Sequence, residues 1–193
     1  MFEQRDLYSE LKGAIDLHIH STPDAFPRML DDLEVAQQAR DAGMRAVMLK
    51  GHVTTTCDRA YLVKRVIQGV DVFGGIVLNH PVGGLNPAAV AAAIRMGAKA
   101  VWMPTMWAEQ HVRYARQTSM DGYMAIGMAF PERGISVLSR SGQLLPEVMK
   151  ILDLIAENNL MLGMGHLCFK EQKALIVAAK QAGVRQIVVN HPT

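Results

Sequence analysis

The sequence predicts an α/β protein in which helices alternate with the strands of a parallel sheet. Three segments share one pattern, a helix end, a glycine and an apolar strand, with the glycine at Gly43, Gly97 and Gly183. Such a glycine adopts the left-handed conformation that ends a helix. The strands that follow are near-continuous apolar runs, which fit parallel strands covered on both faces. Alternation of this kind indicates βαβ units and a parallel sheet.

Two further helix ends extend the pattern. Gly69 marks one, and the pair Asn158 and Asn159 marks the other, since asparagine also tolerates the left-handed conformation. The interval between positions 97 and 158 is about twice as long as the others, which predicts an insertion within one unit. We expect this insertion at residues 105–143, as a lid over the strand ends.

The pattern predicts six strands, at residues 14–20, 45–50, 72–79, 99–104, 160–166 and 186–191. It predicts five helices, at residues 30–42, 57–68, 86–96, 144–157 and 169–182. Asp31 or Asp32 is expected to cap the first helix. Asn86 is expected to cap the third, because a proline at the next position suits the first helical residue.

Composition limits the classes of protein to which the chain can belong. Its 193 residues, half of them hydrophobic, are enough for one domain, which we place at residues 1–193. The net charge is only +2 and the charges are interspersed, so we expect neither a nucleic-acid nor a membrane partner. The N-terminus does not resemble a signal peptide, and the two cysteines have no metal-type or disulfide-type spacing. A reduced, cytoplasmic protein is the prediction.

His18 and His20 are the most informative residues, because they lie two apart in a predicted strand. Residues at this spacing point to the same side, so the two imidazoles project together while Leu17 and Ile19 pack behind them. Burying two imidazoles side by side is costly unless something satisfies their nitrogens. The pair therefore predicts half of a site for a divalent metal.

Other polar residues also follow the predicted strands. They are Lys50, His52, Asn79, His80, His166 and His191. The C-terminal ends of parallel strands form the rim where α/β proteins bind ligands, so we expect these side chains to meet there. His80 precedes a proline, and a simple loop residue is an equally good interpretation. Asp16 shares a face with the pair, so it is expected to line the barrel below them, to orient an imidazole or to accept a proton, whereas Asp24 is either a turn residue or a proton acceptor.

The pattern of histidines at the ends of the predicted strands resembles that of the amidohydrolase superfamily, whose members are (β/α)₈ barrels with one or two metal ions. The run Asp16-Leu17-His18-Ile19-His20 and the histidines at the ends of the fifth and sixth strands carry the resemblance. The segments Leu-Lys-Gly-His, Val-Gly-Gly-Leu-Asn-Pro and Val-Trp-Met-Pro-Thr more narrowly resemble an uncharacterised amidohydrolase-like family of bacteria and archaea. The resemblance implies a TIM-type barrel of which this chain supplies the first six βα units.

Two departures from the superfamily pattern limit what the resemblance implies. The fourth strand ends in Met103-Pro104-Thr105, without the bridging lysine or glutamate of binuclear members, so a single metal is expected unless Lys50 replaces it. The aspartate of the eighth strand has no counterpart. Six strands would leave open sheet edges, so we expect either a fragment of a longer protein or a partner chain, such as a second copy, that supplies the rest.

The resemblance implies a metal-dependent hydrolase that acts on a carbonyl-type centre of a small molecule. Zinc would be held by His18, His20 and His166, and it would activate the attacking water. His191 would polarise the substrate or take a fourth position, and Lys50 and His52 would neutralise negative charge. A mononuclear decarboxylase or lyase is an alternative, as is a barrel that binds a metal or ligand without catalysis. Trp107, Arg113 and Tyr114 are candidate substrate contacts in the insertion.

Overall fold

The computed structural model describes residues 7–118 and 133–191 and shows an α/β fold with two parallel sheets. The first sheet has the order β1-β2-β3, from strands Ile15–Ile19, Ala46–Leu49 and Asp71–Phe73. The second has the order β4-β5-β6-β7, from strands Gly75–Val77, Ala100–Trp102, Met161–Gly163 and Gln186–Val188. Each predicted strand range contains at least one of these strands.

The predicted strand at 72–79 is the one that the structure divides. β3 ends at Phe73 and β4 begins at Gly75, so the chain passes from one sheet to the other at Gly74. A Cβ at Gly74 would lie 2.4 Å from the backbone oxygen of Thr56, so only glycine fits here. Thr56 also donates its backbone N–H to Gly75 O at 3.0 Å. The loop that ends at Thr56, just before the helix that begins at Cys57, therefore forms backbone contacts at the junction between the two sheets.

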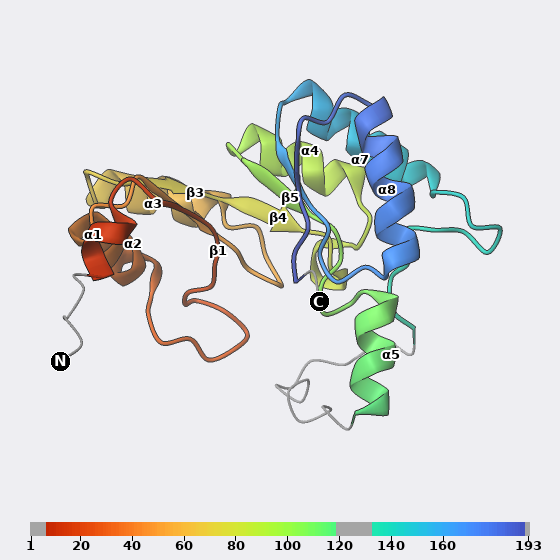
Figure 1. Ribbon diagram of the computed structural model, residues 1–193, viewed down its shortest axis with the longest axis horizontal. Helices are drawn as coiled ribbons and strands as arrows, with labels where there is room; N and C mark the ends of the chain where they lie inside the picture. Colours follow the sequence, from red (N-terminus) through yellow and green to blue (C-terminus); the bar gives the residue numbers. More distant parts are fainter. Residues whose placement is uncertain (1–6, 119–132, 192–193) are drawn as a thin grey trace.

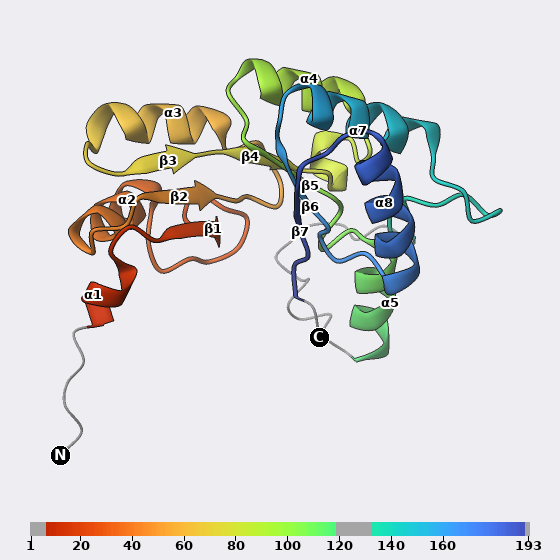
Figure 2. The same cartoon turned by 45° about the horizontal axis from the view of Figure 1, so that its top comes forward.

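All five predicted helices are present. They are α2 at Asp32–Asp41, α3 at Cys57–Val66, α4 at Pro87–Arg95, α7 at Pro146–Glu157 and α8 at Phe169–Gln181. Asp31, not Asp32, caps α2 in a capping box with Glu34, and Asn86 caps α4 as expected. Figures 1 and 2 show α2 and α3 beside the first sheet and α4, α7 and α8 beside the second. The sequence did not predict the short helix α1 at Leu7–Leu11, the helix α5 at Glu109–Gln117 or the 3₁₀ turn His80–Val82.

The predicted insertion is only partly described, since residues 119–132 lie outside the described ranges. α5 occupies its first part and extends away from the sheets (Figure 1). Its start is fixed by the returning chain, because Glu109 donates its backbone N–H to Ile135 O at 2.9 Å and Ile135 donates to Trp107 O at 2.6 Å. The part of the insertion nearest the strands is therefore anchored to the rest of the fold.

Trp102 fills the face of the sheets that lies away from the helices. Its side chain is fully buried and packs with Met48 of β2, Val77 of β4 and Met161 of β6. A Cβ at Gly163 would lie 2.1 Å from the indole Cδ1, so the indole occupies the space that this glycine leaves free. This apolar cluster joins the two sheets and forms a floor beneath their C-terminal ends.

The first strand differs from the prediction. Ile19 packs on the core of the first sheet, but Leu17 is 43% exposed instead of packing behind the histidines. Leu17 shares the exposed face of β1 with Ile15, which is 47% exposed, and a bulge between Asp16 and Ile19 shifts the register against β2, so that Ile19 departs from this alternation. Among the described residues β1 and β7 each pair on one side only, so the two sheets present open edges. No helix in the described ranges has the length and apolarity needed to cross a membrane.

Candidate functional site

Six histidines form a continuous series of ring contacts that spans both sheets. Along the series, the distances between ring centroids are 4.5 Å for His52–His20, 5.1 Å for His20–His18, 5.6 Å for His18–His191, 5.3 Å for His191–His166 and 4.8 Å for His166–His111. We call these six residues the histidine cluster. Four of them follow the C-terminal ends of parallel strands, where ligands bind in such folds. His80 is not among them; it is exposed in the 3₁₀ turn.

His18, His20 and Lys50 form the centre of the cluster. The Nε2 atoms of the two histidines are 3.1 Å apart, and Lys50 Nζ lies 3.0 Å from His18 Nε2. Lys50 is only 1% exposed and its ammonium sits 5.5 Å from the ring centre of Trp102. Three nitrogen atoms that can each carry or release a proton thus meet above the indole floor.

Burial is the main cause of the perturbed pKa values here. Together with the charge of Lys50, it lowers the pKa of His18 to about 4 and that of His20 to about 3. Burial also lowers the pKa of Lys50 to about 7, with a contribution from Arg28. Both imidazoles are therefore neutral at pH 7, so each has one ring nitrogen with a lone pair that can bind a metal or accept a proton.

The loop that follows His20 is held by a buried ion pair that sequence reasoning missed. Arg59 of α3 donates to both carboxylate oxygens of Asp32, each at 2.6 Å, and to the backbone oxygens of Ser21 and Pro23 at 3.0 and 2.9 Å. Ser21 donates its hydroxyl to the same carboxylate at 2.5 Å. These bonds join the loop to two helices and fix the direction in which β1 presents its histidines.

Asp24 and Asp16, the two aspartates near His18 and His20, make different contacts. Asp24 has a fully buried side chain that receives Arg28 Nε at 2.8 Å, and its Oδ2 lies 3.9 Å from His20 Nδ1. That Nδ1 is buried without a hydrogen bond of ordinary geometry in the described part of the chain. Asp16 was expected to orient an imidazole, but its carboxylate instead accepts the backbone N–H of His18 at 2.8 Å. Among the described residues, Asp24 is the acidic side chain that approaches a ring nitrogen of the pair.

His52 is supported by buried polar residues at the ends of β4 and β5. Its Nδ1 lies 3.0 Å from Thr105 Oγ1, and Asn79 donates to His52 O at 3.0 Å and to Thr105 Oγ1 at 2.8 Å. Asn79 and Thr105 have no exposed surface. Burial and the neighbouring His20 and Lys50 charges hold the pKa of His52 far below its usual value, so it stacks on His20 as a neutral ring.

The second sheet contributes His166 and His191, and α5 contributes His111. The Nδ1 atoms of His166 and His111 are 2.9 Å apart. Burial, with smaller contributions from the charges of His111 and Lys50, lowers the pKa of His166 to about 3. The sequence assigned no role to His111, because a single histidine on a helix carries no spacing signal.

A cavity of about 990 Å³ opens beside this end of the cluster. His111, His166 and His191 line one side, and apolar side chains of α8 such as Ile176 and Val177 line another. Of the three predicted substrate contacts, Tyr114 lines this cavity and Arg113 lines a smaller hollow of about 300 Å³. Trp107 is buried in a satellite core with Phe26, so it belongs to the packing of the insertion.

The predicted metal ligands do not all meet at one point. His18 and His20 are in contact, whereas the ring contact between His166 and this pair in the described part of the chain runs through His191. Within residues 7–118 and 133–191, no group of three or more His, Cys, Asp or Glu side chains is placed to hold a metal ion. The donors that fit a metal are therefore the His18–His20 pair, whose two nitrogens face each other at ligand-to-ligand distance.

Comparisons with known proteins assign a family but no activity. A search of the curated proteins finds no match. A structure described as a "putative deoxyribose-phosphate aldolase from Coccidioides immitis" is 14% identical with a TM-score of 0.49; the match covers 95% of this chain and 61% of that one. "QR15, an Aldolase" is 14% identical with a TM-score of 0.37, over 93% and 91% of the two chains. Such distant likenesses carry no argument about the reaction. A family model matches residues 13–193, and the chain belongs to that family, DUF6282, a family of unknown function.

Proposed function

We propose that the chain is a metal-dependent hydrolase of the amidohydrolase type, in which His18 and His20 hold a divalent cation. The observation that carries the proposal is the 3.1 Å separation of their Nε2 atoms. Two imidazole nitrogens, each about 2.0–2.1 Å from a tetrahedral zinc ion, lie roughly 3.3 Å apart. In the metal-free protein a hydrogen bond between the two nitrogens accounts for this distance, and in the proposed complex the cation takes the place of that hydrogen. Zinc is the ion that such imidazole ligands favour.

The surroundings of His20 support this role. Its Nδ1 faces the carboxylate of Asp24 at 3.9 Å, with the backbone of Lys50 as the other nearby acceptor. A histidine that binds a metal through Nε2 carries its proton on Nδ1 and donates it to such a group. The carboxylate is itself held by Arg28, at 2.8 Å. In the proposed metal-bound form, the cation replaces the contacts of these two nitrogens with each other and with Lys50, and Asp24 provides the support that ligand histidines usually have.

The second sheet supplies the rest of the proposed site. His191 contacts the rings of both His18 and His166, and on this basis we include His166 in the proposed ligand set. We take the whole fold as part of a (β/α)₈-type barrel, in which two further strands between the open edges of β1 and β7 would close the sheet. Such a barrel would enclose the cluster at its C-terminal mouth.

A divalent cation supplies, when bound, a Lewis acid that polarises a carbonyl group and lowers the pKa of water. The chain's own residues bind and orient the substrate. Lys50, released from His18 Nε2, donates to the oxygen on which negative charge develops, and His191 is placed to donate beside it. Asp24 accepts the proton, being the buried carboxylate nearest the pair. The cavity of about 990 Å³ has room for a small organic molecule with an apolar part.

The test is a metal titration followed by a substrate screen. The chain, stripped with a chelator, is titrated with Zn²⁺ and Co²⁺, and the loaded protein is assayed on esters, lactones, amides and carboxylated compounds. We expect one tightly bound ion per chain and hydrolysis of at least one ester, lactone or amide. Loss of carbon dioxide from a carboxylated compound instead would identify a lyase. Tight metal binding without turnover of any compound would indicate a metal-binding module without catalysis. Absence of metal binding would contradict the proposal.

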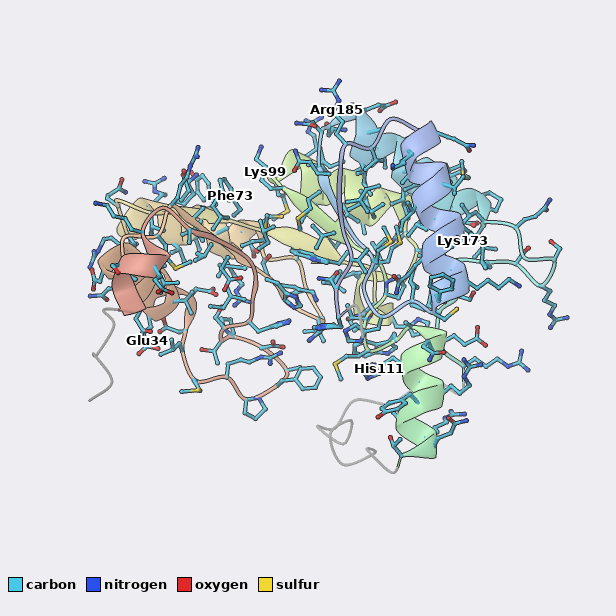
Figure 3. All side chains as sticks on the ribbon, in the orientation of Figure 1. Glu34, Phe73, Lys99, His111, Lys173 and Arg185 are labelled. Atoms are coloured by element: carbon cyan, nitrogen blue, oxygen red, sulfur yellow. The ribbon has the colours of Figure 1, made fainter. Side chains whose placement is uncertain are left out.

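Replacing Lys50 by methionine tests whether this lysine serves catalysis or the stability of the fold. We expect the free energy of unfolding to rise by about 1 kcal/mol, since an apolar chain of similar length then occupies a site that disfavours charge. Turnover should fall about 10²-fold, because a donor to the developing charge is gone. Urea unfolding and steady-state kinetics measure the two effects. Lys99→Met, at an exposed position far from His111 in Figure 3, is the matched control and should change neither.

A further inference from the structure

The geometry points to His111 as a positioning residue that holds the proton of His166 on Nδ1 and so leaves His166 Nε2 as a bare lone pair facing the histidine cluster. The inference rests on the proposed function only in what the lone pair is for, which is to bind the cation or accept a proton. Through His111, α5 of the insertion becomes part of the site. There His111 determines the tautomer of His166, which follows β6 of the second sheet.

The contact between the two rings is a hydrogen bond between identical atoms. His111 Nδ1 and His166 Nδ1 are 2.9 Å apart, with ring centroids at 4.8 Å and an interplanar angle of 31°. In a pair of neutral imidazoles one Nδ1 must carry a hydrogen and the other must not. The bond therefore forces opposite tautomers on the two residues. Whichever ring donates through Nδ1 has an unprotonated Nε2 on its other side.

Both partners are held firmly enough for this bond to persist. His166 donates its backbone N–H to Pro104 O at 2.9 Å. It follows Gly165, where φ is +62° and a Cβ would lie 2.4 Å from the backbone oxygens of both Met103 and Pro104. His111 lies in the first turns of α5, at the end of that helix nearest the sheets (Figure 3). The neighbouring Val112 is buried, so the helix cannot rotate freely.

The charges around the pair decide which ring donates. The ring of His166 lies between His111, which contacts its Nδ1, and His191 of the histidine cluster, and the positive charge of Lys50 in that cluster also acts on it. A lone pair is favoured over an N–H on the side that faces a cation, whether that cation is an ammonium or a metal. His111 lines the cavity, so its own Nε2–H has access to water or to a ligand there. His166 is therefore the donor through Nδ1, and His111 is the acceptor.

The experiment reads the tautomers directly in the metal-free protein. Long-range ¹H–¹⁵N correlation spectra of the full chain, recorded near pH 7, show which ring nitrogen of each histidine carries a hydrogen. We expect His166 to be protonated at Nδ1 and His111 at Nε2. In His111→Leu, which keeps bulk and removes the acceptor, His166 should change to the Nε2–H form. In His111→Asn, whose side-chain oxygen replaces the acceptor, the Nδ1–H form should be retained. The signals of His80, exposed and remote, serve as the internal control.

Zinc titrations of the same variants connect the tautomer to binding. Loss of an orienting partner typically costs 10–100-fold in metal affinity, so His111→Leu should bind zinc about 10-fold or more weakly and His111→Asn nearly as well as the wild type. Protonation of His166 at Nε2 in the wild type, or an unchanged His166 tautomer in a folded His111→Leu, would overturn the inference. If the wild type binds no zinc but the tautomers behave as expected, the proposed function fails and the positioning role of His111 stands.

Discussion

Replacing His18 or His20 by alanine is expected to reduce zinc affinity by at least two orders of magnitude. Each histidine contributes one of the two Nε2 atoms that lie 3.1 Å apart, and a single imidazole does not form a site. Changes in residues that only support a ligand cost 10–100-fold, so the loss of a ligand should cost more. Isothermal titration against a competing chelator measures the affinity. Turnover, if zinc-dependent, should fall to the level of the metal-free protein.

Controls separate this loss from unfolding. Both histidines are half-buried and lie at the rim of the sheet, outside its apolar core, so circular dichroism should show an unchanged fold. His80→Ala, which alters an exposed histidine of the 3₁₀ turn, should bind zinc as the wild type does. Zinc affinity that is the same in His18→Ala, His20→Ala and the wild type would contradict the assignment of the pair.

Replacing Arg59 by alanine is expected to lower the free energy of unfolding by about 3–5 kcal/mol. The change removes both donors to the carboxylate of Asp32, which is 6% exposed and would stay buried with only the Ser21 hydroxyl. It also frees the backbone oxygens of Ser21 and Pro23, so the loop after His20 loses its attachment to α3. Urea unfolding measures the stability, and the zinc affinity of the folded variant should fall as well.

Two further variants make the comparison specific. Arg40→Ala removes an exposed ion pair with Asp41, and such surface pairs contribute about 0–1 kcal/mol, so little change is expected. The double variant Asp32→Leu with Arg59→Leu removes both buried charges together and should recover part of the stability lost in Arg59→Ala. Equal effects of Arg59→Ala and Arg40→Ala would show that the buried network does not hold the loop.

The alternation of helices and strands was predictable because its signals are local. Gly43, Gly97 and Gly183 all have positive φ in the structure, as helix-ending glycines should, and a strand follows each. Asn86 caps α4 through bonds to two backbone N–H groups of the first turn. The convergence of strand-end histidines also follows from the sequence, since parallel strands place their C-terminal ends at one edge. Each of these inferences needs only the spacing and the residue type.

Other features depend on contacts between distant segments. The division of the third predicted strand at Gly74 arises from the close approach of Thr56, and the packing of Ile19 on the core beside the exposed Leu17 accompanies a bulge that only pairing with β2 creates. The pairing of Arg59 with Asp32, and of His111 with His166, joins residues far apart in the chain. A sequence pattern contains no signal for such pairs, because their meeting depends on how whole elements pack.

For this protein, periodicity and helix-ending residues were enough to indicate parallel α/β architecture and the edge where its imidazoles gather. Which nitrogens face each other there was settled by packing: Lys50 above the Trp102 indole, the bulge in β1, and α5 set against the second sheet. The reason is physical. Backbone preferences act over a few residues, whereas the protonation and orientation of a buried side chain depend on every charge and dipole around it.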